Sequence, residues 1–221
     1  MILRDLREQI VEIGNRMVVN GLAHGGQGNI SAIDVDSRLI AITPSAVPYH
    51  LRTPEDIVVI DLNRKIIEGK WQPTSEIALH MQFYHTRPDV RAVIHTHAPY
   101  ASVFGIIYEP IPMVLIESAT LLSGPVPVAP YARPGTEEVA EVTQKAMGKT
   151  GVACVMANHG LVTVGPNLEQ AYSTTLAAET SARLVILARA MGAQVKTLDE
   201  AECIALREAY LSRYGPKPLP R

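Results

Sequence analysis

The sequence has little cysteine, little net charge and no long hydrophobic run. Its only cysteines, Cys154 and Cys203, form no Cys-x-x-Cys pair, which argues against a disulfide framework and predicts packed thiols in a reducing cytoplasm. With 20 Lys and Arg against 22 Asp and Glu, the formal net charge is −2, so charge gives no reason to expect nucleic acid or an anionic membrane as a partner. The most apolar helical run, residues 184–188 between Arg183 and Arg189, is far too short to span a bilayer.

Internal repeats, low-complexity stretches and Gly/Ser linkers are also missing. Charged residues already stand at Arg4, Asp5, Arg7 and Glu8, so we expect no signal peptide. A hydrophobic content of 47% and a charged content of 19% are typical of a globular protein with a substantial core. At 221 residues the chain is expected to form one domain, residues 1–221.

The hydrophobic pattern predicts hairpins mixed with helices. Leu3, Leu6, Ile10, Ile13 and Met17 recur at helical spacing, with Gly21 placed as a C-terminal cap. Strands are expected at residues 30–35, 39–43, 57–61, 65–68, 92–96, 126–129, 152–157 and 161–164. Further helices are expected from residue 74, at 99–107, 136–147 and 168–191, and from a capping box at 197–200 to about 214. This order favours a largely antiparallel sheet covered by helices over an alternating parallel sheet.

A His-x-His pair within a Val- and Ile-rich strand is the most informative feature. Alternate residues of a strand point to the same side, so His95 and His97 share one space. His159, in the turn 158–160 between two apolar runs, and Glu76, at the start of a helix, are further candidate ligands. Zinc needs three or four such nitrogen, sulfur or oxygen ligands. Core histidines satisfied by hydrogen bonds are the alternative, but the pair and the turn histidine together favour a metal site.

Three segments have the backbone and hydroxyl groups that can bind an anion. The loop 24–31 carries three glycines in four positions, which suits either an anion-binding loop or a tight turn. The turn 43–46 places Ser45 at a strand end, and Thr74 and Ser75 precede a helix. The hydroxyls of Thr74 and Ser75 can serve as helix caps, and the same helix end can also bind an anion.

Taken together, these segments resemble the class II aldolase and adducin family, and most of all its L-fuculose 1-phosphate aldolases. The pieces stand in family order: Gly28-Asn29-Ile30-Ser31, Thr43-Pro44-Ser45, Thr74-Ser75-Glu76, His95-Thr96-His97-Ala98 and Asn158-His159-Gly160. The resemblance covers nearly the whole chain. It implies a single-domain α/β fold of three αβα layers with a central mixed, largely antiparallel sheet. It also implies a homotetramer with active sites at subunit interfaces.

The resemblance also implies the roles of the site residues. One zinc ion per chain would be bound by His95, His97 and His159. Glu76 would be the fourth ligand in the resting enzyme and the catalytic acid and base when substrate displaces it. Tyr214 would assist protonation at the aldehyde half of the substrate. The substrate phosphate would lie among the following residues: Gly28, Asn29, Ser45, Ala46, Thr74 and Ser75.

The implied reaction is the reversible cleavage of a ketose 1-phosphate, such as L-fuculose 1-phosphate, to dihydroxyacetone phosphate and an aldehyde. Three positions depart from the fuculose enzymes: Gly26 replaces a threonine, Ala46 a glycine, and Ile116 the tyrosine of the aldehyde pocket. An apolar Ile116 suits a deoxygenated or methylated aldehyde.

Related activities therefore stay open. They are a 5-deoxypentulose 1-phosphate aldolase, a methylthioribulose 1-phosphate dehydratase and a sugar-acid phosphate decarboxylase. Glu76 argues against a ribulose-phosphate epimerase, in which the resemblance places an aspartate. The histidines and Glu76 argue against a non-catalytic, adducin-like binding module.

Overall fold

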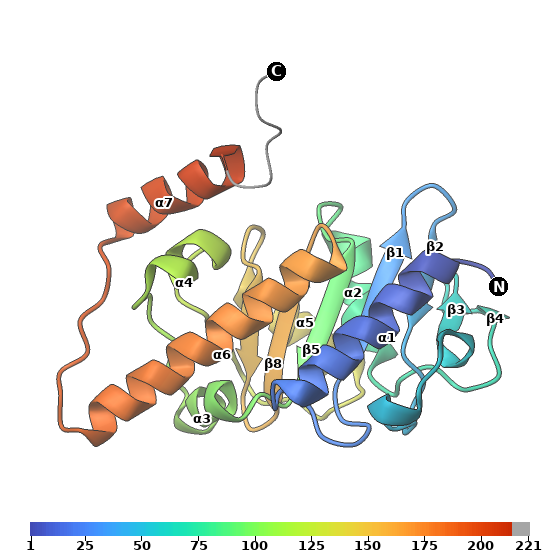
Figure 1. The fold of residues 1–221 in the computed structure, drawn as a ribbon, viewed down its shortest axis with the longest axis horizontal. Coiled ribbons are helices and arrows are strands. Elements are labelled where there is room, and N and C mark those ends of the chain that lie inside the picture. Colours follow the sequence, from blue (N-terminus) through green and yellow to red (C-terminus); the bar gives the residue numbers. More distant parts are fainter. Residues whose placement is uncertain (214–221) are drawn as a thin grey trace.

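The computed structural model describes residues 1–213, in which eight strands form one twisted sheet between helices (Figure 1). The strands are β1 (Asn29–Asp34), β2 (Leu39–Ile42), β3 (Val58–Ile60), β4 (Ile66–Glu68), β5 (Ala92–Thr96), β6 (Val128–Ala129), β7 (Ala153–Met156) and β8 (Gly160–Gly165). Their order is β4-β3-β2-β1-β5-β8-β7-β6. All neighbouring pairs are antiparallel except β6 and β7. The expected mixed, largely antiparallel sheet is confirmed.

Helices cover both faces of this sheet. They are α1 (Arg4–Val19), α2 (Ile77–Thr86), α3 (Pro99–Ile107), α4 (Ile116–Leu121), α5 (Glu137–Met147), α6 (Leu168–Ala190) and α7 (Glu200–Arg213), with 3-10 turns η1 (Tyr49–Leu51) and η2 (Pro54–Asp56). Alternation along β5 shows the two faces: Ile94 packs in the core shared with α1, α3 and α6, and Val93 in the core shared with α2 and α5. The three expected αβα layers are therefore present.

The predicted boundaries hold to within a few residues, with two corrections. Helix α4 was not predicted, because six residues are too few to show a helical period. The predicted capping box at 197–200 is wrong: α7 begins at Glu200, and Asp199 Oδ1 accepts a hydrogen bond from the Ala201 N–H at 2.9 Å. Within residues 1–213 no helix combines the length and hydrophobicity that a membrane crossing needs.

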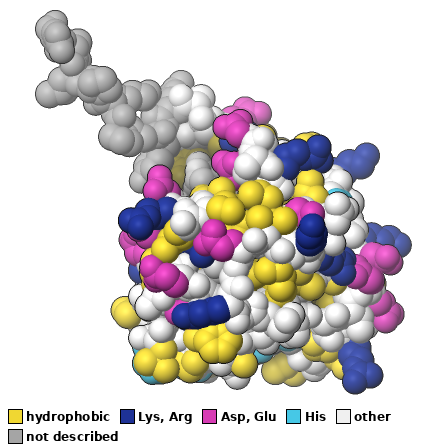
Figure 2. Space-filling view, turned by 90° about the vertical axis from the view of Figure 1, so that its right-hand side faces the viewer, with side chains coloured by type: hydrophobic (Ala, Val, Ile, Leu, Met, Phe, Trp, Pro, Cys, Tyr) yellow, Lys and Arg dark blue, Asp and Glu magenta, His cyan; other side chains and the backbone are white. Residues whose placement is uncertain are grey.

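The sheet edge at β4 exposes two hydrophobic side chains, Ile66 and Ile67. Seen from the β3–β4 side, hydrophobic side chains lie in patches separated by charged ones (Figure 2). Arg64, just before β4, forms an ion pair with Glu137, and Glu68 in β4 binds Arg7. Charges beside an edge strand discourage pairing with another sheet.

Candidate active site

Three histidines meet at one end of the central strands. His95 lies in β5, His97 directly follows it, and His159 lies in the turn between β7 and β8. Their ring centroids are 5.0 Å (His95–His97), 4.7 Å (His95–His159) and 5.3 Å (His97–His159) apart. One ligand atom from each lies within 4.8 Å of the other two. The group predicted from sequence therefore has the geometry of a metal-binding group.

Two glycines allow the chain to close around His95. A Cβ on Gly28 would lie 2.6 Å from the His95 carbonyl oxygen, and the φ of Gly28 is +75°. A Cβ on Gly160 would lie 2.3 Å from the Thr96 carbonyl oxygen and 3.1 Å from the His95 ring. Real Cβ atoms do not approach backbone oxygens so closely. Both positions therefore need glycine if the loop 24–31 (the glycine loop) and the turn with His159 are to reach β5.

The hydrogen bonds of His95 leave one ring nitrogen for a metal. Its Nδ1 lies 3.1 Å from the Leu161 carbonyl oxygen, which can only accept, so Nδ1 carries the hydrogen. In the neutral ring Nε2 then has a free lone pair. This buried atom has no hydrogen-bond partner among the described residues and lies 3.2 Å from Glu76 Oε2. Two acceptors face each other here, an arrangement that a bound cation stabilises, so the residues fit a metal ion.

Glu76 is the N-cap of α2, only 8% exposed, and lies between the histidines. Its Oε1 is 3.4 Å from His159 Nε2 and has no hydrogen-bond partner in the described chain. Burial opposes the ionisation of Glu76, whereas the hydrogen bond that the Asn29 amide donates to Oε2 lowers its pKa. Burial lowers the pKa of His159 to about 4 and also lowers that of His97. A carboxylate beside neutral imidazoles is the donor set that zinc accepts.

A cavity of about 430 Å³ opens beside these groups. The six residues predicted to surround a phosphate all line it, together with Glu76, His97 and His159: Gly28, Asn29, Ser45, Ala46, Thr74 and Ser75. Within the described chain no group accepts a hydrogen bond from the N–H of Gly26, Gly28, Ala46 or Ser75. Unpaired backbone donors in a cavity wall suit an anion.

Residues 8–186 match the family described as Class II Aldolase and Adducin N-terminal domain. The chain belongs to the class II aldolase and adducin family. It is 35% identical over 203 residues to a 5-deoxy-D-ribulose 1-phosphate aldolase of Bacillus thuringiensis serovar kurstaki, covering 91% of this chain and 93% of the relative. It is also 35% identical over 210 residues to an L-fuculose phosphate aldolase of Escherichia coli strain K12, covering 95% of each. A solved L-fuculose 1-phosphate aldolase superposes with a TM-score of 0.89 at 34% identity, over 94% of this chain and 96% of that one.

Family membership and the three-histidine group identify an enzyme, a metal-dependent class II aldolase and thus a lyase. Some residues that line the cavity of this class II aldolase could not be predicted from its sequence. Pro134 and Gly135, between β6 and α5, reach the cavity, and a Cβ on Gly135 would lie 3.2 Å from the Ser75 carbonyl oxygen. A Pro-Gly pair by itself indicates only a turn.

Other predicted residues lie elsewhere or in a different role. Ile116, expected in the aldehyde pocket, is on α4, 60% exposed, and does not line the cavity. Tyr214 lies outside the described residues. Thr74 and Ser75 are not the N-cap of α2; instead Thr74 Oγ1 accepts from the Glu76 N–H at 3.2 Å.

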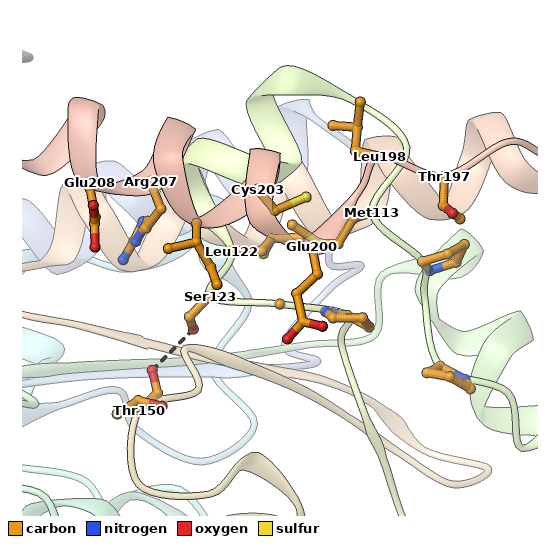
Figure 3. A pocket seen from close by; sticks show the side chains of 15 residues that line it. Met113, Leu122, Ser123, Thr150, Thr197, Leu198, Glu200, Cys203, Arg207 and Glu208 are labelled. Carbon is orange, nitrogen blue, oxygen red and sulfur yellow. Dashed lines mark hydrogen bonds between the residues drawn. The ribbon is translucent and has the colours of Figure 1, made fainter.

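A larger cavity, of about 920 Å³, lies between α7 and the segments 110–125 (Figure 3). Its wall is largely apolar, with Met113, Leu122 and Leu198 among the side chains, and the Ser123 hydroxyl donates to the Thr150 carbonyl at 3.0 Å beside it. Among the described residues that line it there is no histidine and none of the predicted site residues. The smaller cavity therefore holds the groups that can perform the aldolase chemistry.

Proposed function

We propose that this class II aldolase is zinc-dependent and cleaves a ketose 1-phosphate reversibly to dihydroxyacetone phosphate and an aldehyde. One observation carries the proposal. A cavity lined by His97 and His159, whose rings lie beside that of His95, also contains the Glu76 carboxylate and a wall of hydroxyl groups and of N–H groups that have no acceptor within residues 1–213. The first two suit chemistry on a carbonyl compound, and the third suits its phosphate.

The zinc ion would be held by His95, His97 and His159, with Glu76 as a fourth ligand in the resting enzyme. When bound, zinc supplies a Lewis acid that stabilises the negative charge developing on the substrate oxygens. The free Nε2 of His95 and its distance of 3.2 Å from Glu76 Oε2 support this assignment.

Glu76 moves the proton. In cleavage the bond between C3 and C4 breaks, its electron pair stays on C3, and the C4 hydroxyl passes its proton by way of Tyr214 to solvent as the aldehyde forms. Glu76 then delivers a proton to C3, and in condensation it removes that proton again. Its position at the start of α2, between the histidines and the cavity, supports both roles.

The phosphate would lie against Gly28, Ala46 and Ser75, where backbone N–H groups lack acceptors within the described chain. The hydroxyls of Ser45 and Thr74 line the same wall. The start of α2 adds the favourable field of a helix N-terminus.

The part of the site that would bind the aldehyde half of the substrate favours an apolar group there. Ile116 is hydrophobic where the resemblance places a tyrosine, and a relative at 35% identity is named for a 5-deoxypentulose phosphate. We therefore rank a 5-deoxypentulose 1-phosphate with L-fuculose 1-phosphate as substrates to be compared first.

We further infer a cytoplasmic homotetramer whose sites lie between subunits. The two cysteines are free, as expected of a reducing compartment. Ile116 is exposed and away from the cavity of its own chain. A neighbouring subunit is therefore the natural source of the aldehyde pocket.

The test is a panel of ketose 1-phosphates with the zinc-loaded protein, with dihydroxyacetone phosphate detected by a coupled dehydrogenase. The proposal expects its release from at least one member of the panel and none from the unphosphorylated ketose. Loss of water without this product would indicate the dehydratase, and release of carbon dioxide from a sugar-acid phosphate would indicate the decarboxylase.

A further inference from the structure

A chain of buried polar side chains leads away from Glu76 between α2 and β1. Asn29 Nδ2 lies 2.8 Å from Glu76 Oε2, and Asn29 Oδ1 lies 2.5 Å from His80 Nε2. His80 Nδ1 lies 2.6 Å from Ser31 Oγ, which lies 2.6 Å from Tyr84 Oη. His80 and Ser31 have no exposed surface, and Asn29 is 4% exposed.

Secondary structure aligns these five side chains. Asn29 and Ser31 alternate with Ile30, which packs in the opposite core, so both face α2. Glu76, at the N-cap of α2, His80 and Tyr84 are spaced by four residues and share one face of the helix. Apolar residues at these positions would extend the core, so the polar groups need another explanation.

The charge of Glu76 determines the direction of every hydrogen bond. A carboxylate only accepts, so Asn29 must turn its NH₂ group to Glu76 and its Oδ1 to His80. His80 Nε2 must then carry the hydrogen. Burial lowers the pKa of His80 to about 3, so the ring is neutral and Nδ1 accepts from the Ser31 hydroxyl. Ser31 Oγ in turn accepts from Tyr84.

We propose that His80 is a positioning residue for Glu76 and acts through Asn29; this rests on the proposed function of Glu76. By donating to Asn29 Oδ1, His80 prevents the amide from rotating. A rotated amide would place Oδ1 against the carboxylate at about the present 2.8 Å, and the repulsion would turn Glu76 away from the histidines.

Two variants of His80 separate this role from simple core packing. His80→Gln keeps a donor near the position of Nε2, whereas His80→Met has a similar length and no donor. The reaction to follow is the exchange of solvent deuterium into dihydroxyacetone phosphate by the zinc-loaded enzyme. The kcat of this exchange should be about 10- to 100-fold lower in the Met variant than in wild type. The KM of the Met variant should be unchanged, and the Gln variant should recover most of the rate.

Thr163→Val is the matched control. Thr163 is a fully buried hydroxyl on β8, paired with Thr175 at 2.6 Å and remote from this chain of hydrogen bonds. Its loss should lower thermal stability and leave kcat unchanged. Equal loss of rate in the Met and Gln variants, or a loss confined to stability or KM, would overturn the proposal.

A second measurement needs neither metal nor activity. In the ¹⁵N-histidine spectrum of wild-type apoprotein, His80 should carry its hydrogen on Nε2, with Nδ1 unprotonated. Hydrogen on Nδ1 would require the opposite amide orientation and would overturn the proposal even if the variants failed to fold. If wild type catalysed no exchange, the proposed function would fail, and the His80 tautomer would still decide this inference.

Discussion

Gly28 is the residue at which the glycine loop comes closest to the metal-binding strand. Gly28→Ala should cost about 1–2 kcal/mol for its left-handed backbone, and the added Cβ, 2.6 Å from the His95 carbonyl oxygen, must also displace the loop. We expect kcat/KM to fall on the order of 100-fold, because a shift of about 1 Å in a site has this effect.

Gly21→Ala is the control for Gly28. Gly21 has a similar φ of +68°, but a Cβ there would meet nothing within 4 Å. It should show the backbone cost in chemical denaturation without loss of activity. Equal activity losses in the two variants would contradict the close approach to His95.

Ser75 tests the phosphate end of the cavity. Ser75→Ala removes one hydroxyl from the cavity wall. It should raise KM by the factor that corresponds to a loss of about 1.5–3 kcal/mol in binding free energy, the value of a hydrogen bond to a charged group. Inhibition by inorganic phosphate should weaken in parallel. An unchanged inhibition constant would place the phosphate elsewhere.

At the scale of elements, α3 depends on a carboxylate from α6. Glu179 accepts from the N–H groups of Tyr100 and Ala101, at 3.0 and 2.7 Å, in the first turn of the helix that follows His97. Glu179→Ala leaves both groups without this acceptor and should cost about 1–3 kcal/mol in the free energy of unfolding. It should also weaken zinc binding, because the start of α3 anchors the segment that carries His97.

Glu169→Ala, on the same helix, is the comparison. Glu169 forms an exposed ion pair with Arg16, which should contribute at most about 1 kcal/mol. Zinc affinity, measured by competition with a chelator, should be unchanged in this variant. A similar loss of affinity in both would contradict the link between α3 and His97.

Sequence periodicity predicted the long elements well, because their hydrophobic residues must face a core. It missed α4, whose six residues span less than two turns. It also placed the last helix cap at Thr197 instead of Asp199, since both residue types are favourable helix caps. Such choices depend on tertiary contacts.

At the scale of the whole molecule, the local motifs predicted the metal and anion groups because strand alternation and glycine spacing are properties of the chain itself. Site residues that come from parts of the chain distant from these motifs could not be predicted. Pro134 and Gly135 reach the cavity only through the fold, and His80 is linked to Glu76 only through Asn29 on another strand.

A shared site between subunits predicts complementation. Chains carrying Glu76→Gln and chains carrying Tyr214→Phe should each have low aldolase activity, since each lacks a residue assigned to the reaction. Refolded together, they should form tetramers containing some sites with both wild-type residues, if Tyr214 acts on a neighbouring subunit. Recovered activity, with a tetramer mass by light scattering, supports the proposal; activity no higher than the sum of the two would contradict it.

Glu76 is proposed to move a proton at the carbon next to the carbonyl of dihydroxyacetone phosphate. The direct measurement is solvent deuterium exchange into this compound, which needs no aldehyde. Glu76→Gln keeps the side-chain size and an oxygen that can accept from Asn29, but it cannot take up the proton. With zinc retained on the three histidines, exchange should slow on the order of 100- to 10,000-fold relative to wild type. Rapid exchange by the zinc-loaded variant would contradict this role of Glu76.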